Sequence, residues 1–219
     1  ELRNADSEGT AWSCAHGTGR WSRDCGCSTG GRPGWKQQWR APLRAALDTL
    51  RVRLDARFEE RMWELELDPW RVRDAYIPDG ESCPTPQAFG RWLRKSGLVK
   101  RPLPSARIRE IRMLLEAQKF LLFSYTSCGW FFSDIAGIET VQNLAYAGRA
   151  LQLAKLHINE AVTGEFLGQL ARAQSNLGGT TGKVLFERHV MPWWQDLGLL
   201  AAGAALRLLF SRSDKRSLP

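Results

Sequence analysis

The stretch PLRAALDTLRVRLDARFEERMWEL, residues 42–65, decides the fold class. It places an apolar side chain at every third or fourth position, namely at Leu43, Leu47, Leu50, Leu54, Phe58, Met62 and Leu65. This spacing predicts a long helix with one apolar stripe. Acidic and basic residues lie between the apolar positions, as on a solvated helix face. Because the stripe must be buried, we expect other helices to pack on it.

Helical patterns recur along the rest of the chain. In TPQAFGRWLRKSG, residues 85–97, a threonine cap and a proline open a helix and a glycine ends it. No stretch alternates apolar and polar residues as a strand would. The sequence therefore predicts an all-α bundle of six or seven helices over residues 41–212. We expect residues 1–40 to form an ordered, irregular Gly-, Cys- and Trp-rich segment packed on this bundle, and the basic tail 213–219 to be disordered.

Composition restricts the environment and the partners of the chain. The most apolar window, residues 197–210, contains Arg207 and is shorter than the roughly 20 residues of a membrane span, so we expect a core helix there. The formal net charge is +8, but basic residues are interleaved with acidic ones in stretches such as RVRLDARFEERMWELE, so nucleic acid is not an expected partner.

Five cysteines cannot all pair, and the chain opens without a leader or a methionine. We expect an excised piece of a cytoplasmic protein.

The segment WSCAHGTGRWSRDCGCSTGGRPGW, residues 12–35, concentrates metal-binding side chains. Cys14, His16, Cys25 and Cys27 offer the thiolate and imidazole donors of a closed, structural zinc site. The spacings C-x-H and C-x-C are tighter than the usual two to four residues between zinc ligands. The thiols can instead be small buried residues, or Cys14 can pair with Cys25 or Cys27 in an oxidising compartment.

Aromatic and polar residues of the same segment also suit a sugar. Indole faces stack on flat apolar surfaces, and charged groups hydrogen-bond to hydroxyls at the rim. A second group lies in SYTSCGWFFSDIAGIETVQN, residues 124–143. The alternative is that the tryptophans fasten the loop to the bundle and that the aspartate caps a turn. The candidate substrate-binding residues are Trp12, His16, Arg20, Trp21, Asp24, Trp35, Trp130 and Asp134.

The stretches TAWSCAHGTGRWSRDCGCSTGGRPGWKQQWRAPLRAALDTLRVRL and YTSCGWFFSDIAGIETVQNL resemble a known domain. It is the C-terminal domain attached to one branch of glycoside hydrolase family 57, catalogued as domain of unknown function 3536. The resemblance implies a helical companion of an α-glucan-active catalytic barrel whose catalytic carboxylates lie upstream. It further implies that this chain has no catalytic residues and no activity alone, that its partners are the barrel and an oligosaccharide, and that the sugar faces Trp12, His16, Arg20, Trp21, Asp24 and Trp130.

Three functions follow from these observations, in this order of preference. The first is the helical domain of a family 57-type hydrolase, which packs on the barrel and helps to form its carbohydrate cleft. The second is a structural zinc-binding helical module for protein interaction. The third is a basic nucleic-acid-binding domain.

Overall fold

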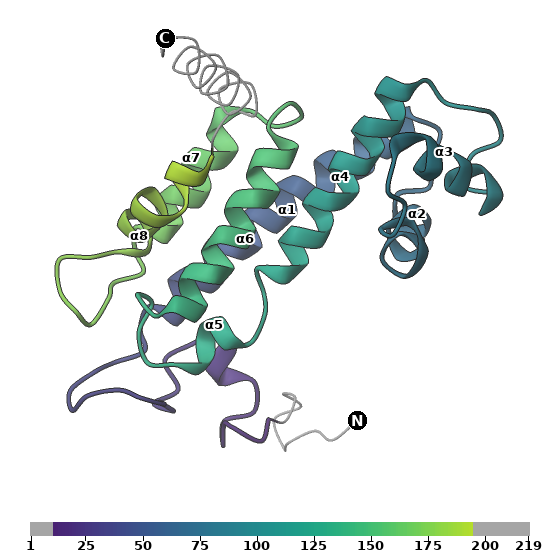
Figure 1. The fold of residues 1–219 in the computed structure, drawn as a ribbon. Helices are drawn as coiled ribbons and strands as arrows, with labels where there is room; N and C mark the ends of the chain where they lie inside the picture. Colours follow the sequence, from purple (N-terminus) through teal and green to yellow (C-terminus); the bar gives the residue numbers. More distant parts are fainter. Residues whose placement is uncertain (1–10, 195–219) are drawn as a thin grey trace, which may run out of the picture.

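A computed structural model describes residues 11–194 of the chain, and these residues form a bundle of helices (Figure 1). The predicted all-α fold is confirmed: the described residues contain no strand beyond two isolated bridges. Within residues 11–194, seven helices have seven or more residues, and α5 is a single short turn. The helices are α1 (Arg40–Glu64), α2 (Pro69–Ala75), α3 (Pro86–Lys95), α4 (Ser105–Phe123), α5 (Cys128–Phe131), α6 (Ile138–Ala154), α7 (Glu160–Leu170) and α8 (Gly182–His189).

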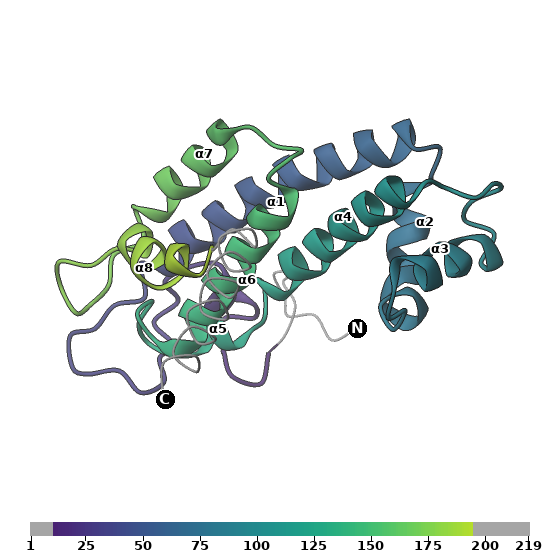
Figure 2. The ribbon, with the colours of Figure 1, turned by 45° about the horizontal axis from the view of Figure 1, so that its top comes forward.

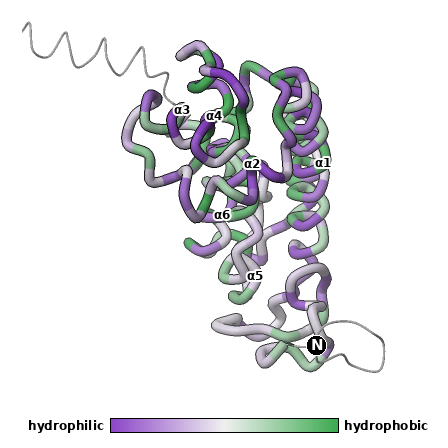
Figure 3. Tube along the Cα trace, turned by 90° about the vertical axis from the view of Figure 1, so that its right-hand side faces the viewer, coloured by the Kyte–Doolittle hydropathy of each residue, from purple (hydrophilic) through white to green (hydrophobic). Residues whose placement is uncertain are grey.

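Helix α1 is the central element of the bundle, as its apolar stripe predicts. Every residue of the predicted stripe is buried. Helices α7 and α4 run beside α1, and α6 lies against α4 (Figures 1 and 2). The first half of α1 packs with α6, α7 and α8 in one hydrophobic core, and its last turns pack with α2, α3 and the start of α4 in a second core. Figure 3 shows hydrophobic and hydrophilic residues alternating along the helices, as expected for elements with one buried face.

The two ends of α1 carry different structures. At its C-terminal end lie α2, a π-helical turn over Tyr76–Gly80, and α3 (Figure 1). The cap predicted for α3 is confirmed, since Thr85 Oγ1 accepts a hydrogen bond from the Ala88 N–H at 3.1 Å and Gly97 takes a positive φ of 66° after the helix. At the N-terminal end of α1 lies the irregular segment, which contains the short 3-10 helix η1 (Gly19–Trp21).

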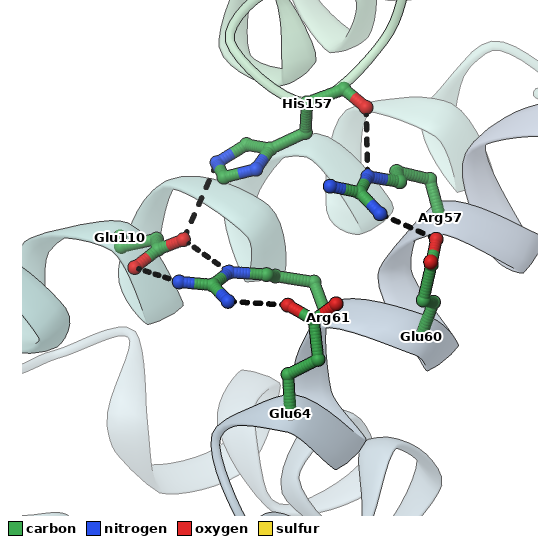
Figure 4. A network of polar contacts seen from close by, with 6 residues as sticks. All are labelled: Arg57, Glu60, Arg61, Glu64, Glu110 and His157. Carbon is green, nitrogen blue, oxygen red and sulfur yellow. Dashed lines mark hydrogen bonds and ion pairs between the residues drawn. The ribbon is translucent and has the colours of Figure 1, made fainter.

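A polar network joins α1 to α4 and to the turn after α6 (Figure 4). Arg61 donates to both carboxylate oxygens of Glu110, with Nη2 3.1 Å from Oε2. His157 Nε2 lies 3.8 Å from Glu110 Oε1, and Arg57 Nε donates to the His157 carbonyl at 2.8 Å. Arg61 also pairs with Glu64 along α1. These contacts fasten three segments that are far apart in the sequence.

Two sequence predictions lie outside the described residues: the core helix over 197–210 and the disordered tail over 213–219. Among helices of residues 11–194, none combines the length and the apolar character that a membrane crossing requires.

Candidate metal centre

Four potential metal ligands come together in the irregular segment at the N-terminal end of α1. One ligand atom from each of Cys14, His16, Cys25 and Cys27 lies within 4.8 Å of the others. Cys14 is buried, Cys25 and Cys27 are partly buried, and His16 is exposed. The four residues could therefore hold a metal ion near the surface.

Glycines bring these four side chains together. Gly26, between Cys25 and Cys27, has a φ of +78°, which places two neighbouring cysteines in a turn that an L-residue adopts only with strain. Gly17 follows His16 with a φ of +64°. A side chain at Gly19 would be crowded, since a Cβ there would lie 3.3 Å from the Cys25 Cβ. The tight C-x-H and C-x-C spacings are thus compatible with one centre because glycine turns the backbone.

The donor separations fit a tetrahedral zinc ion. With Zn–S bonds of about 2.3 Å and a Zn–N bond of about 2.0 Å, two sulfurs would be about 3.8 Å apart and a sulfur and a nitrogen about 3.5 Å apart. The Sγ atoms of Cys14 and Cys25 are 3.7 Å apart. His16 Nδ1 lies 3.6 Å from Cys27 Sγ and 4.0 Å from Cys14 Sγ. The nitrogen that faces the sulfurs is therefore Nδ1.

The surroundings favour the thiolate form at Cys14. Burial raises the pKa of this thiol, but hydrogen bonds from the backbone of His16 and Arg20 and from the thiols of Cys25 and Cys27 bring the pKa down to about 7. For Cys25, burial is the largest influence and the pKa is raised. A metal ion that binds first to the Cys14 thiolate would cause the neighbouring thiols to lose their protons and become thiolates as well.

Two buried arginines lie beside the cysteines. Arg40, the first residue of α1, is 0% exposed; its Nη1 donates to the Cys27 carbonyl at 2.9 Å and lies 3.8 Å from Cys25 Sγ. Arg20 Nη1 donates to Thr29 Oγ1 at 3.3 Å, and its guanidinium lies 4.7 Å from the centre of the Phe131 ring. Among the described residues, neither arginine forms an ion pair with a carboxylate, and the Nε atoms of both are buried without a hydrogen bond. Burial lowers the pKa of Arg40.

Polar contacts fasten the segment that carries the candidate ligands to two distant loops. Ser133 Oγ accepts from the Thr29 N–H at 3.0 Å and donates to the Thr29 carbonyl at 2.8 Å. Asn176 does the same for Lys36: its Oδ1 accepts from the Lys36 N–H and its Nδ2 donates to the Lys36 carbonyl, both at 2.8 Å. Each side chain thus satisfies both backbone groups of a loop residue.

The predicted Asp134 serves this second junction. Its Oδ1 accepts from Ser175 Oγ and from the Ala136 N–H, each at 2.8 Å. Its Oδ2 accepts from the Asn176 N–H at 2.6 Å and from the Asn176 Nδ2 at 3.0 Å. Both oxygens of the carboxylate are therefore used to hold the 175–176 turn.

The predicted aromatic residues have different environments. Trp130 is 1% exposed in the core and stacks on Tyr125, so its ring is not available to a ligand in this structure. Trp12 is 92% exposed and lies against Phe131. Trp21 is partly buried, and its Nε1 donates to the Ser127 carbonyl at 3.3 Å.

Trp35 lines a shallow depression of about 280 Å³ beside the metal-binding segment. Phe132 and Glu139, which were not among the predicted site residues, line it as well, together with Asp134. Of the other predicted residues, Asp24 is exposed, and its Oδ1 accepts from the Gln37 N–H at 3.3 Å. The structure thus separates the predicted residues into the metal centre, this depression and the core.

Arg40, Ser133 and Asn176 were missed by the sequence reasoning. An arginine at a helix start and two small polar residues in loops carry no pattern that marks them. Only the glycine between Cys25 and Cys27 offered a signal, because C-G-C permits a turn that C-x-C with a larger residue resists.

Comparison with known proteins identifies the bundle. The model of the family described as domain of unknown function (DUF3536) matches residues 35–218. The candidate ligands precede the matched region. No curated protein and no solved structure matches the chain. Since the matched region covers most of the sequence, the chain belongs to the DUF3536 family.

Proposed function

We propose that this chain is a helical module whose N-terminal segment is fixed on the bundle by a structural zinc ion. Cys14, His16, Cys25 and Cys27 would be the ligands. The observation that carries the proposal is the convergence of four donor atoms within 4.8 Å of one another, with three pairs 3.6, 3.7 and 4.0 Å apart, near the values of a tetrahedral ion.

The donor set favours zinc over other ions. Three soft sulfurs and one imidazole suit zinc better than magnesium, calcium or manganese, which prefer oxygen ligands. Four protein ligands leave no open coordination position, so the role would be structural and not catalytic. When bound, zinc would cross-link the four ligands and so stabilise a segment that has little secondary structure of its own.

Charge balance supports the same assignment. Three thiolates and one Zn²⁺ ion carry a net charge of −1. Arg40, buried beside Cys25 without a carboxylate partner in residues 11–194, would neutralise that charge. Because a buried cation is costly without anions near it, an anionic centre beside Arg40 is favoured, in addition to the Asp24 carboxylate, whose charge already opposes the lowering of the Arg40 pKa by burial.

The test is the metal content of the purified chain by elemental analysis. We expect about one zinc per chain, as one closed site requires. The double variant Cys25→Ser, Cys27→Ser should contain none. The matched control, Cys83→Ser with Cys128→Ser, removes the two cysteines outside the centre and should keep the metal. A folded wild-type protein without metal, even after incubation with zinc, would refute the proposal and leave the thiols as hydrogen-bonded packing residues.

A second function concerns carbohydrate. We propose that the depression beside the centre binds part of an α-glucan when this domain packs on the catalytic barrel of a family 57-type hydrolase. The specific observation is the combination of Trp35, Phe132 and Glu139 around one hollow. Aromatic faces and a carboxylate are the groups that bind the C–H face and the hydroxyls of a sugar ring.

Titration with a maltooligosaccharide tests this second proposal. We expect weak binding that is lost in Trp35→Ala and kept in Trp63→Ala, which removes another exposed tryptophan far along α1. The binding should be insensitive to salt, and the chain alone should not hydrolyse the sugar. Equal affinities for the wild type and Trp35→Ala would count against the depression as the site.

A further inference from the structure

The α3 end of the molecule carries most of the excess positive charge. Residues 82–109 contain seven of the 31 basic residues and none of the 23 acidic residues. Outside this stretch, basic and acidic residues nearly balance, although the net charge of the chain is +8. The charge is therefore concentrated, in contrast to the interleaved pattern along α1. The seven residues lie on α3, on the loop after it and on the first turns of α4, and they are here called the basic face: Arg91, Arg94, Lys95, Lys100, Arg101, Arg107 and Arg109.

We propose that the basic face binds the phosphate backbone of a nucleic acid, without selecting particular bases. This inference is independent of the metal centre, which lies at the other end of α1 (Figures 1 and 2). It also revises the expectation from the sequence that the positive charge is too scattered for a polyanion.

The basic residues of this face are available to a ligand. All seven are exposed. Within residues 11–194 none of them forms an ion pair, whereas on α1 arginines such as Arg53 and Arg61 are paired with Glu165 and Glu110. Exposed cations without internal partners create a positive field that attracts an extended anion.

A hollow of about 550 Å³ gives part of the basic face a defined shape. It is lined by Arg91, Arg94, Lys95 and Trp92. Trp92 stacks on Phe89 with ring centres 5.3 Å apart. On Gly80, a Cβ atom would lie 2.7 Å from the Trp92 ring. Contacts with Phe89 and Gly80 therefore hold Trp92 in place, and the partly buried ring lines the hollow.

The chemistry of the face favours phosphate over other anionic partners. Five of its seven cations are arginines, whose planar guanidinium groups match phosphate oxygens in pairs. Residues 82–109 contain no large exposed hydrophobic side chain. The centre of a protein interface and an interfacial membrane anchor both require such side chains. A nucleic-acid backbone requires only charge and hydrogen-bond donors.

Fluorescence anisotropy with a labelled DNA duplex of mixed sequence tests the proposal. We expect the full chain to bind with an affinity that falls steeply between about 50 and 200 mM salt. The triple variant Arg91→Ser, Arg94→Ser, Lys95→Ser should bind at least about tenfold more weakly, and the slope of log K against log salt should decrease by about 3. A single strand should not bind more tightly than the duplex, because the basic face contacts phosphates and residues 82–109 carry no large exposed aromatic side chain.

A matched control separates the basic face from net charge. The variant Arg149→Ser, Lys155→Ser, Arg188→Ser removes three exposed cations on α6, just after it, and on α8. It should bind duplex as the wild type does. An equal loss of affinity in both triple variants, or no duplex binding at about 50 mM salt, would overturn the proposal. Tighter binding to vesicles of anionic lipid or to polyglutamate than to duplex would also overturn it, in favour of a membrane or an acidic protein.

Discussion

Arg40, the first residue of α1, is completely buried, and its Nη1 lies 3.8 Å from the sulfur of Cys25. The same atom holds the carbonyl of Cys27 at 2.9 Å. One side chain of the bundle therefore contacts both cysteines of the C-G-C turn, and it connects the first residue of the central helix to the candidate metal centre.

This contact predicts that Arg40→Met weakens metal binding without removing a ligand. Loss of the guanidinium leaves the anionic centre without its buried counter-charge and the Cys27 carbonyl without its donor. We expect the zinc affinity, measured by competition with a chromophoric chelator, to fall by about 10- to 100-fold. Arg172→Met, at an exposed arginine, should leave the affinity unchanged. An unaltered affinity in Arg40→Met would show that Arg40 supports the loop only through packing.

The separation of 3.7 Å between the sulfurs of Cys14 and Cys25 predicts a disulfide in metal-free protein. A disulfide bond is about 2.0 Å long, so a small movement brings the two sulfurs together. With hydrogen peroxide, two thiols lose two protons and two electrons as the S–S bond forms, and the peroxide accepts them and is reduced to two molecules of water. Zinc should slow the reaction because it occupies the sulfur lone pairs.

Peptide mapping by mass spectrometry measures this reaction. We expect one linked peptide containing Cys14 and Cys25 after chelation and oxidation, and little of it when zinc is present. In Cys25→Ser the linked peptide should be absent. A disulfide to Cys83 or Cys128, or equal oxidation rates with and without zinc, would contradict the arrangement of donors described above.

The double hydrogen bond between Asn176 and Lys36 predicts that Asn176→Ala loosens the attachment of the segment to the bundle. The variant leaves both backbone groups of Lys36 and the Oδ2 of Asp134 without this partner. We expect a loss of about 1–3 kcal/mol in the free energy of unfolding and faster amide exchange at Lys36. The neighbouring substitution Gln174→Ala, at an exposed side chain, should have little effect on either measurement. Unchanged exchange at Lys36 would mean that other contacts suffice.

The success of the sequence prediction differs between helix and site for a physical reason. The stripe from Leu43 to Leu65 is a local pattern whose period alone defines a buried helix face, and all of it is buried. Ligand types are also local, so Cys14, His16, Cys25 and Cys27 could be named as candidate ligands from the sequence. The convergence of these side chains could not be predicted, because the spacings alone left open whether all four could reach one ion. The positive φ of Gly26 shows how the backbone brings Cys25 and Cys27 together.

Residues whose role depends on tertiary packing could not be assigned from the sequence. Trp130 and Asp134 stand in an aromatic, acidic stretch that reads equally well as a binding site or as core and cap. The structure uses Trp130 in the core and Asp134 to hold a turn. Arg40 shows the opposite difference between sequence and structure. Its position on a charged helix suggests an exposed side chain, but the side chain is buried because the loop covers it.

The pairing of Glu110 with Arg61 predicts a stability contribution that depends on pH (Figure 4). The hydrogen bond from Arg61 is the largest influence, and it lowers the pKa of Glu110 below its ordinary value of 4.5. A carboxylate with a lowered pKa stabilises the fold above the pKa of the unfolded chain, and this contribution is lost as the pH falls through the lowered pKa.

Urea unfolding of Glu110→Gln across this range measures the contribution. At pH near 7 we expect the variant to be about 2 kcal/mol less stable than the wild type, because Arg61 loses a charged partner that joins α4 to α1. The difference should begin to shrink below pH about 4.5, where the unfolded chain binds a proton at this carboxyl, and it should be lost as the pH falls through the lowered pKa of Glu110 in the folded protein. Glu60→Gln removes a more exposed carboxylate that pairs with Arg57 within α1, and it should cost about 0.5 kcal/mol or less at every pH. A difference for Glu110→Gln that stays constant down to pH about 3 would show that side-chain packing, and not the ion pair, is what Glu110 contributes.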